Sequence, residues 1–528
     1  MSAVGGNAME QVVLVDERDL PLGLHEKVEA HIGEGLLHRA FVALVFNSHG
    51  QLLIAQRAAG KMLWSLWWDN TCASHPRDGE AYEAAGERRL TEELGFSCPL
   101  RLADKFNYHA PFQDVGSERE VCATLVGSYD GKVVPNTDEV ADWKWIDLPA
   151  LLKDFEAQPG VYTPWFVLAL QRLIGSGIVD ARNGGSVMLL PERDTEVYFT
   201  RASALVQPLV EEILREGIRP EHHDAMVYQV SSGGKRLRPS VAIASCLALG
   251  GSLDDVLYAA ASIEVLHNAT LITDDIIDHG ETRRGLPTVW KKHGQAFAEC
   301  AALSYTVSVY EGLAKHGRLD LAPILTKAMK AVVDGELLDI LFEDSGREDE
   351  GFIRTNRPDR VTLEDYTEMV GCKTAEVFAA AAELGGACAK GSPEQLAALR
   401  DFGVNFGLMF QIQDDILDIY GDEKAFGKQI GKDIMEHKRG NAVLLLGLQA
   451  MNPPSHKRCV SIINQGTFTE EDLNDILAHL ESVWARDKAH MLAVRYASDA
   501  KKALLGLPEN PWREVLDDLV DYCLDRQR

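Results

Sequence analysis

Two copies of one acidic motif constrain the fold of this chain more than any other feature. The motif Asp-Asp-x-x-Asp occurs at Asp274–Asp278 and again at Asp414–Asp418, and each copy follows an apolar stretch that favours a helix. In a helix the first and last aspartates of a copy lie on one face. Burying such carboxylates costs much free energy unless cations offset their charge. The pattern therefore predicts a fold that brings hard divalent cations, and the phosphate oxygens they bind, to these two helices.

Composition limits the classes of partner. The chain has 528 residues, of which 46% are hydrophobic, so it predicts two to four domains with sizeable cores. Its formal net charge of -27 argues against nucleic acids and anionic membrane surfaces as main partners. Anionic substrates would therefore need local basic groups and metal ions to offset the overall repulsion.

The compartment is predicted from cysteines and from the apolar pattern. Nine scattered cysteines without a Cys-x-x-Cys pair are typical of a reducing environment. Residues 1–16 lack the basic and apolar regions of a signal peptide, and no uninterrupted apolar run reaches the length of a membrane span. We expect a cytoplasmic protein without a transmembrane segment.

The sequence pattern changes about a third of the way along the chain. The first part mixes β-rich runs, such as Ala40–Phe46, with turn residues and one helical stretch near 79–94, which indicates an α/β or α+β domain. From Asp194 onward long helical periodicities dominate. Glycine-rich segments separate the two. We therefore expect a multidomain chain, with an α/β (α+β) domain at 1–175, a linker at 176–193 and an all-α domain at 194–528.

Basic residues accompany the acidic motifs in the helical part. A flexible, cationic stretch covers 233–239, and adjacent arginines follow the first motif. Scattered lysines and helical histidines are usually surface or core residues, so only the whole set predicts a diphosphate site. The set comprises Lys235, Arg238, His267, Arg283, Arg284, Lys373, Lys428 and Lys438.

The motifs GGKRLRP, DDIID, RRG, KT, FQIQDDILD and GK, in this order, make residues 194–528 resemble the all-trans polyprenyl diphosphate synthases. The resemblance implies an all-α isoprenoid-synthase bundle with a central cavity, usually a homodimer. It implies that magnesium binds Asp274, Asp275, Asp278, Asp414, Asp415 and Asp418. It implies that an allylic diphosphate binds Arg283, Lys373, Lys428 and Lys438, and that isopentenyl diphosphate binds Lys235, Arg238, His267 and Arg284. Thr374 and Gln411 belong to the same motifs. A terpene cyclase is the weaker alternative, because cyclases usually lack both GGKRLRP and a second complete acidic motif.

Product length is expected to depend on small residues before the first acidic motif. Ala269 and Thr270 stand five and four residues before Asp274, where farnesyl-producing relatives usually have an aromatic. A short, blocked pocket is thus not expected, although Leu266 could end the pocket one turn further on. The prediction is geranylgeranyl or a longer all-trans diphosphate.

The first part of the chain carries a second candidate site. Three histidines and two glutamates, namely His31, His38, His75, Glu118 and Glu120, suit a transition metal. Glu80, Arg88, Glu92, Glu93 and Gly95 have a Nudix-like spacing on a helix. Arg89 stands where ordinary Nudix hydrolases have a glutamate, which argues against plain pyrophosphate hydrolysis.

Residues 10–172 resemble type 1 isopentenyl diphosphate isomerase in the stretches EGLLHRAF, NT with SHP, EREVC and TPW. The resemblance implies that the three histidines, Glu118 and Glu120 bind a first metal, Mn²⁺ or Zn²⁺, and that Glu93 helps to hold Mg²⁺. It implies diphosphate binding by Lys27, Arg57, Lys61 and Arg89. Glu120 and Tyr108 would transfer a proton, and Trp165 would stabilise a tertiary carbocation through its π face.

One position departs from that family. Its catalytic cysteine lies two residues before the motif histidine, where this chain has Ala73, while Cys72 is the immediate neighbour. Adjacent residues of an extended segment point to opposite sides, so Cys72 replaces the missing thiol only if the backbone turns it inward. We favour a fusion of an isomerase, with Cys72 as the thiol, and a prenyl synthase. The alternative is an active synthase with a non-catalytic, diphosphate-binding regulatory module.

Overall fold

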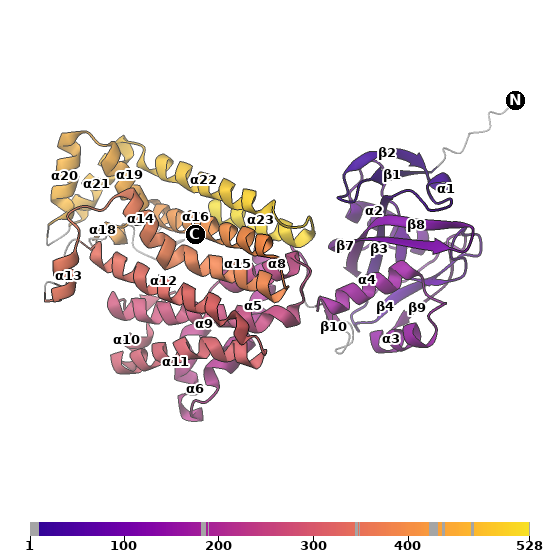
Figure 1. The fold of residues 1–528 in the computed structure, drawn as a ribbon, viewed down its shortest axis with the longest axis horizontal. Coiled ribbons are helices and arrows are strands. Elements are labelled where there is room, and N and C mark those ends of the chain that lie inside the picture. Colours follow the sequence, from indigo (N-terminus) through magenta and orange to yellow (C-terminus); the bar gives the residue numbers. More distant parts are fainter. Residues whose placement is uncertain are drawn as a thin grey trace. The chain divides into compact units, whose positions relative to one another are not determined.

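The computed structural model describes residues 10–180, 186–187, 189–343, 347, 349–421, 431–435, 439–465 and 469–526 (Figure 1). It divides into two compact units, Met1–Glu192 with Glu509–Pro511, and Arg193–Pro508 with Trp512–Arg528. The division after Glu192 lies near the end of the expected linker. The limits 1–175, 176–193 and 194–528 remain predictions.

The first unit is built on a mixed sheet of nine strands. Its strands are β1 (Gln11–Val15), β2 (Pro21–Glu26), β3 (His38–Phe46), β4 (Leu52–Arg57), β5 (Trp68–Asp69), β6 (Cys72–Ser74), β7 (Leu100–Phe112), β8 (Gly116–Ser128) and β9 (Val140–Ile146). Its helices are α1 (Lys27–Ala30), α2 (Tyr82–Leu94), α3 (Leu148–Ala157) and α4 (Pro164–Gly175), followed by the short pair β10 (Val179–Asp180) and β11 (Ser186–Val187).

Strand register brings distant residues of this unit together. Strands β3 and β8 run parallel, with His38 opposite Glu120. Strands β7 and β8 are antiparallel, with Tyr108 opposite the same Glu120. Strand β6 pairs with β3 so that Ala43 lies opposite Cys72. A histidine, a tyrosine and a glutamate from three separate segments thus become neighbours.

The core of the first unit lies between the sheet and helix α2. It contains Phe41 and Ala43 of β3, Leu125 of β8 and Leu90 of α2. Glycine at position 86 lets α2 approach closely, because a Cβ there would lie 2.5 Å from Leu100 Cδ1. One face of the sheet is therefore occupied by packing.

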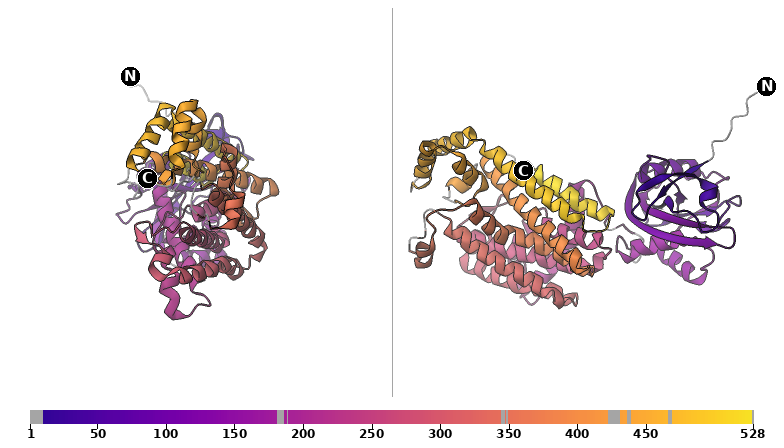
Figure 2. Two further views of the ribbon diagram at one scale, coloured as in Figure 1. Left: turned by 90° about the vertical axis from the view of Figure 1, so that its left-hand side faces the viewer. Right: turned by 45° about the horizontal axis from the view of Figure 1, so that its top comes forward.

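The second unit is helical (Figures 1 and 2). Its first helices are α5 (Thr195–Arg215), η1 (Pro220–His222), α6 (His223–Met226), α7 (Tyr228–Ser231), α8 (Leu237–Ala248), α9 (Leu253–Ile277), α10 (Val289–His293), α11 (Gln295–Lys315), η2 (Leu319–Leu321) and α12 (Ala322–Leu341). They continue with α13 (Gly351–Asn356), α14 (Leu363–Val370), the π-helical turn η3 (Gly371–Ala375), α15 (Glu376–Cys388), α16 (Pro393–Tyr420), α18 (Lys432–Met435), α19 (Ala442–Ala450), α20 (Pro453–Ile463), α21 (Glu470–Ser482), α22 (Ala485–Leu504) and α23 (Pro511–Leu524). A short hairpin joins β12 (Thr282–Arg283) to β13 (Leu286–Pro287).

Helix α9 is the central element of this bundle. It packs against α8, α11 and α15 and carries the first acidic motif at its C-terminal end. Among the described helices it alone is long and apolar enough to cross a membrane, yet 67% of its apolar window is buried inside the protein. Its apolar length therefore serves the core. The predicted order of fold classes, an α/β (α+β) domain followed by an all-α bundle, is confirmed.

Glycines allow close packing around the turn η3. A Cβ at Gly335 of α12 would lie 2.4 Å from the backbone nitrogen of Lys373, and one at Gly407 of α16 would lie 2.5 Å from Ala375 Cα. Real side chains do not approach so closely, so η3 is clamped between α12 and α16. Irregular helical turns of this kind are frequent at functional sites.

Candidate active sites

The first unit contains a compact group of metal-ligating side chains. One ligand atom from each of His31, His38, His75, Glu118 and Glu120 lies within 4.8 Å of all the others. The histidine rings are close neighbours, with centroids 4.7 to 5.3 Å apart. The structure therefore brings together all five residues that the sequence proposed for a first metal.

Backbone carbonyl oxygens fix the orientation of two histidine rings. Lys27 O lies 2.5 Å from His31 Nδ1, and Leu36 O lies 2.7 Å from His38 Nδ1. These contacts leave Nε2 of both rings facing the centre, the usual arrangement behind a metal-binding histidine. His31 Nε2 is 2.8 Å from Glu118, and His38 Nε2 is 3.4 Å from Glu120. Nitrogen and oxygen donors in this arrangement fit a transition metal.

Burial and charge shift the pKa values of this group in different directions. Burial, together with Lys27 and the neighbouring histidines, holds the pKa of His75 well below its usual value. Burial acts on Glu120 in the raising direction, but His38 and the Tyr108 hydroxyl outweigh it and lower the pKa of Glu120. The site therefore favours a neutral His75 beside an ionised Glu120, the forms in which both residues bind metals.

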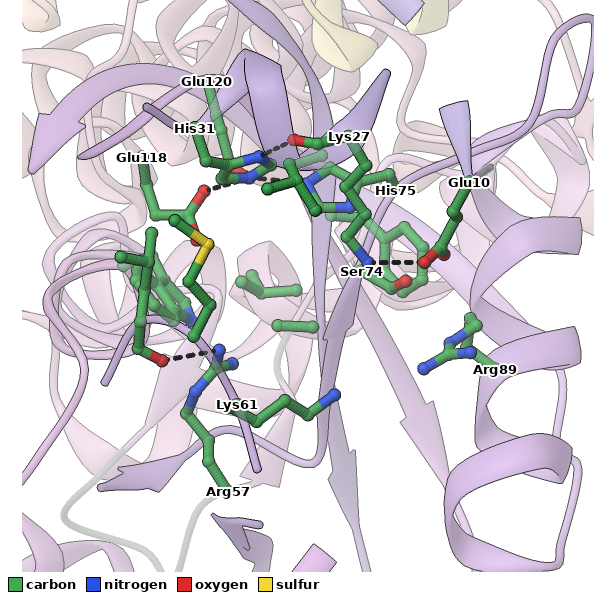
Figure 3. A pocket seen from close by; sticks show the side chains of 18 of the residues that line it. Glu10, Lys27, His31, Arg57, Lys61, Ser74, His75, Arg89, Glu118 and Glu120 are labelled. Atoms are coloured by element: carbon green, nitrogen blue, oxygen red, sulfur yellow. Dashed lines mark hydrogen bonds and ion pairs between the residues drawn. The ribbon is translucent and has the colours of Figure 1, made fainter. Parts of the chain in front are cut away.

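A cavity of about 290 Å³ opens beside the metal ligands (Figure 3). Figure 3 shows His31, Glu118 and Glu120 on one side of it, and Arg57 and Lys61 across from them. Lys27 and Arg89 also line it, so all four basic residues proposed for a diphosphate reach one cavity. Their charges are partly balanced, because Lys27 pairs with Glu10 at 3.1 Å and Lys61 pairs with Glu139.

Two aromatic residues complete the cavity wall. The Tyr108 hydroxyl donates a short hydrogen bond to Glu120, and burial beside Glu120 holds the pKa of Tyr108 well above its usual value. Trp165 is 3% exposed and also lines the cavity. A hydrogen-bonded tyrosine–carboxylate pair and a tryptophan side chain thus border the same cavity.

The structure does not bring Cys72 into this cavity. Ala73 lines the cavity, whereas Cys72 lies in the core cluster between the sheet and α2. Burial and the carboxylate of Glu93 hold the pKa of the Cys72 thiol well above its usual value. The extended backbone of β6 explains the result, because neighbouring side chains point to opposite faces. The predicted role of Cys72 as a cavity thiol is therefore corrected.

Glu93 also lies behind the cavity wall. It accepts a hydrogen bond from Arg89 Nε at 3.1 Å, and it is 7% exposed. Burial raises its pKa, although Arg89 and Lys61 oppose that effect. A magnesium ion at Glu93 would compete with Arg89, so this assignment remains a proposal.

In the second unit the first acidic motif is held by protein cations. Arg283 of the hairpin donates to both oxygens of Asp275, at 3.0 and 2.9 Å, and to Asp274 at 3.0 Å. Lys373 lies 3.1 Å from Asp274. Asp275 is 4% exposed, and burial raises its pKa. Asp278 follows as the residue that caps the C-terminus of α9.

In the second motif the middle aspartate is fully engaged. Asp415 accepts hydrogen bonds from Tyr366 Oη at 2.7 Å, from the backbone of Ala442 at 2.8 Å and from Gln411 Nε2 at 3.1 Å. It is 3% exposed. Asp414 pairs instead with Arg526, whose guanidinium also lies over the Phe410 ring. Asp415 is therefore held by donors from α14, α16 and α19.

The turn η3 links the two motifs. Lys373 contacts Asp274, while Thr374 donates a hydrogen bond to Gln411 at 3.0 Å, and Gln411 holds Asp415. Lys373 also lies 2.8 Å from Glu336 and 2.6 Å from Asp339. Burial, offset in part by Lys373, raises the pKa of Glu336 to about 7. The two acidic helices therefore share one bridging segment.

A basic group adjoins α8 and α9. Arg238 lies 3.1 Å from His267 Nε2 and over the Phe378 ring. Burial and the nearby arginines hold the pKa of His267 well below its usual value, so a neutral His267 faces Arg238. Arg284 contacts the Gly233 carbonyl, and Lys235 lies 3.4 Å from Glu196. The region is rich in cations, which suits a diphosphate.

Some predicted residues lie outside the described ranges, and some observed ones were not predicted. Lys428 and Lys438, which were predicted to bind the allylic diphosphate, lie outside the described residues. Five residues contact the predicted site residues but were not predicted themselves, namely Glu336, Asp339, Tyr366, Arg526 and Glu139. Glu336 and Asp339 share a helix face at spacing i, i+3, a weak signal. Tyr366 and Arg526 contact the second acidic motif, and Glu139 contacts Lys61 and Arg89, only through tertiary structure.

Comparisons with known proteins follow the same division. The polyprenyl synthetase family model matches residues 219–480, and the NUDIX domain model matches residues 36–166. A short chain isoprenyl diphosphate synthase of Methanothermobacter thermautotrophicus is 33% identical over 328 residues, which are 60% of this chain and 96% of that protein. An isopentenyl-diphosphate Delta-isomerase of Burkholderia multivorans is 47% identical over 163 residues, which are 31% of this chain and 92% of that protein. The chain belongs to both the polyprenyl synthetase and isopentenyl-diphosphate isomerase families.

Solved structures agree for the helical unit. A decaprenyl diphosphate synthase from Rhodobacter capsulatus has 27% sequence identity and a TM-score of 0.57, over 64% of this chain and 100% of that one. A geranylgeranyl pyrophosphate synthetase from Pyrococcus horikoshii has 29% identity and a TM-score of 0.56, over 63% and 99%. Both resemblances predicted from the motifs are confirmed.

Proposed function

We propose that this protein is a bifunctional enzyme of isoprenoid synthesis. The first unit converts isopentenyl diphosphate into dimethylallyl diphosphate, and the second condenses allylic diphosphates with isopentenyl diphosphate to geranylgeranyl or longer all-trans products. The observation that carries the proposal is the presence of two built sites in one chain. One combines five metal-ligating side chains with a cationic cavity, and the other joins two acidic motifs to a basic group.

In the first unit, His31, His38, His75, Glu118 and Glu120 would hold a divalent transition metal, Mn²⁺ or Zn²⁺. When bound, this metal would fix the charge of the two glutamates. Arg57, Lys61, Lys27 and Arg89 bind the diphosphate. Tyr108 and Glu120 serve the proton transfer on one side of the double bond, and Trp165 offers its ring to the positive charge that develops. Glu93 would contribute to Mg²⁺ beside the diphosphate.

In the second unit, the six aspartates of the two motifs would hold Mg²⁺, namely Asp274, Asp275, Asp278, Asp414, Asp415 and Asp418. The bound ions supply charge stabilisation for the departing diphosphate. Arg283 and Lys373 bind the allylic diphosphate. Lys235, Arg238, His267 and Arg284 bind isopentenyl diphosphate. The helices around α9 exclude water from the allylic cation, and the double bond of the second substrate attacks it.

The deciding experiment uses isopentenyl diphosphate as the sole substrate. Purified protein with Mg²⁺ and Mn²⁺ is expected to form prenyl diphosphates without added dimethylallyl diphosphate. Products that form only after dimethylallyl diphosphate is added would reject isomerisation and leave the synthase in place. No product under either condition would reject both activities.

One observation favours the alternative of a non-catalytic first unit. The cavity wall carries Ala73 where the isomerases carry a thiol, and Cys72 lies in the core. Ala73→Cys places a thiol on the wall, and Ala73→Ser is the matched control of similar size. If the unit is only a binding module, Ala73→Cys is expected to create or strongly raise product formation from isopentenyl diphosphate alone, and Ala73→Ser is not. An unchanged, high rate in the parent and in both variants would show that the thiol is dispensable here.

We propose a homodimer formed through the synthase unit. Leu303 and Val307 of α11 are 69% and 68% exposed, and Val333 and Leu337 of the neighbouring α12 are 58% and 41% exposed. Such an apolar strip on adjacent helices is typical of an interface. Val307→Glu is expected to give monomers in light scattering, whereas Leu505→Glu, at another exposed leucine, is not. We further propose a cytoplasmic location, supported by nine unpaired cysteines.

A further inference from the structure

A buried carboxylate lies behind the cavity of the first unit. Asp69, at the end of the short strand β5, is 5% exposed and does not line the cavity. Asp69 pairs with Ala55 of β4, so the backbone at Asp69 is fixed within the sheet. A buried carboxylate is costly unless donors surround it, and here two of its donors, Trp165 and Arg57, line the cavity.

Both oxygens of Asp69 accept hydrogen bonds. Asp69 Oδ1 accepts from Trp165 Nε1 at 2.8 Å and from Thr163 Oγ1 at 2.7 Å. Asp69 Oδ2 accepts from Arg57 Nη1 at 3.2 Å. The Arg57 guanidinium in turn lies 5.4 Å from the centre of the Trp165 ring. Since every partner donates, the contacts stabilise the ionised carboxylate, although burial raises its pKa.

We infer that Asp69 is a positioning residue that holds Arg57 beside Trp165 and strengthens the attraction of the Trp165 ring for a cation. This inference rests on the proposed isomerase function. A carboxylate at the indole N–H polarises the ring and raises the negative charge on its face, as hydrogen-bond networks do in a low-dielectric interior. The same carboxylate fixes Arg57 on the cavity wall. One buried charge therefore sets the distance between a diphosphate-binding group and a cation-binding face.

The orientation of Trp165 is also fixed by its neighbours. Trp64 packs edge-on against it, with ring centres 4.9 Å apart, and Thr163 immediately precedes helix α4 and contacts the same Asp69 oxygen. Packing alone would therefore keep the ring in place after loss of Asp69. The electronic contribution of the carboxylate can thus be separated from the position of the ring.

The test compares two ligands that differ in one charge. The first is 2-(dimethylamino)ethyl diphosphate, whose protonated amine stands where positive charge would develop, and the second is its neutral carbon analogue, isopentyl diphosphate. Both are titrated calorimetrically into full-length protein that carries Arg238→Ala, Asp274→Ala and Asp414→Ala, which disable the diphosphate sites of the synthase unit. The ratio of the two affinities reports the cation preference of the remaining site.

In this background Asp69→Asn is expected to reduce the affinity for the ammonium ligand about 5- to 10-fold more than that for the neutral ligand, the scale of one cation–π contact. Thr163→Val, which removes a donor but keeps the carboxylate, is the matched control and is expected to preserve the ratio. Mn²⁺ binding, followed by electron paramagnetic resonance, should be the same in all variants. An unchanged ratio in a folded Asp69→Asn protein would overturn the inference.

A second variant keeps the test open if Asp69→Asn does not fold. Replacing Trp165 with β-(3-benzothienyl)alanine retains a bicyclic aromatic ring but removes the N–H that Asp69 accepts. The same selective loss for the ammonium ligand is expected, and an unchanged ratio overturns the inference. If neither ligand binds the parent protein, the proposed function of this unit fails, and the inference fails with it.

Discussion

The groups that surround the carboxylates differ between the two sites. In the first unit five ligands converge within 4.8 Å, and carbonyl groups fix two of the histidines from behind. In the second unit the protein's own cations, Arg283, Lys373 and Arg526, neutralise the acidic motifs. We therefore propose that the first site holds a resident metal. We propose that ions reach the second site with a substrate and displace the side-chain cations.

The largest effect is expected from the acidic motifs. Asp274→Ala or Asp414→Ala should lower the rate of chain elongation by about 1000-fold or more, because one metal ligand of the departing diphosphate is lost. The measurement is turnover with dimethylallyl diphosphate supplied. Asp401→Ala, at an exposed site on the same helix as Asp414, is the control and should retain activity. Near-normal turnover in either folded motif variant would contradict the assignment.

The contrast between resident and arriving metals can be tested without catalysis. Mn²⁺ or Zn²⁺ alone is expected to raise the stability of the first unit by about 3 kcal/mol at a hundredfold excess over Kd. Mg²⁺ alone should change the stability of the second unit little, and Mg²⁺ with diphosphate should raise it. Calorimetric unfolding with His38→Asn as control would resolve the two transitions. An equal response of the second unit to Mg²⁺ alone would break the comparison.

A smaller effect is expected at the glycine clamp. Gly335→Ala forces a methyl group against the backbone of Lys373 and should cost about 1–3 kcal/mol of stability through overpacking. Because Lys373 moves, the KM for the allylic substrate should rise more than kcat falls. Gly371→Ala is the matched control, since a Cβ there has nothing within 4 Å. Similar kinetics for both variants would show that η3 does not position Lys373.

The smallest change in rate, but a change in product, is expected at Ala269. Ala269→Phe should shorten the main product by at least one isoprene unit, because the ring would block the growing chain. Chromatography of the dephosphorylated products measures this, with Ala269→Ser as the size-matched control. An unchanged distribution would place the floor of the pocket elsewhere, for example at the buried Leu266.

Sequence patterns predicted those features that short spacings determine. Side chains alternate along an extended strand, so the sequence predicted that Ala73 and Cys72 point to opposite sides. In the structure Ala73 lines the cavity and Cys72 lies in the core. The pairing of His38 with Glu120 needed the parallel register of β3 and β8, which no local pattern contains.

Tertiary contacts account for what the sequence missed. Asp415 resembles its neighbours in sequence, yet Tyr366 and the Ala442 backbone, from two other helices, saturate it. Arg526 reaches Asp414 from more than a hundred residues away. Such partners carry no spacing signal, because only packing of the bundle brings them together.

The turn η3 has a mechanical consequence for the synthase unit. Lys373 contacts Asp274 on one acidic helix, and the adjacent Thr374 reaches the other acidic helix through Gln411. The turn η3 therefore connects the two helices that carry the acidic motifs. A cation that displaces Lys373 from Asp274 would also change the hydrogen bond from Thr374 to Gln411, and hence the contact between Gln411 and Asp415. We therefore expect the two motifs to fill cooperatively, so that the pocket changes from empty to fully loaded without a stable half-loaded state.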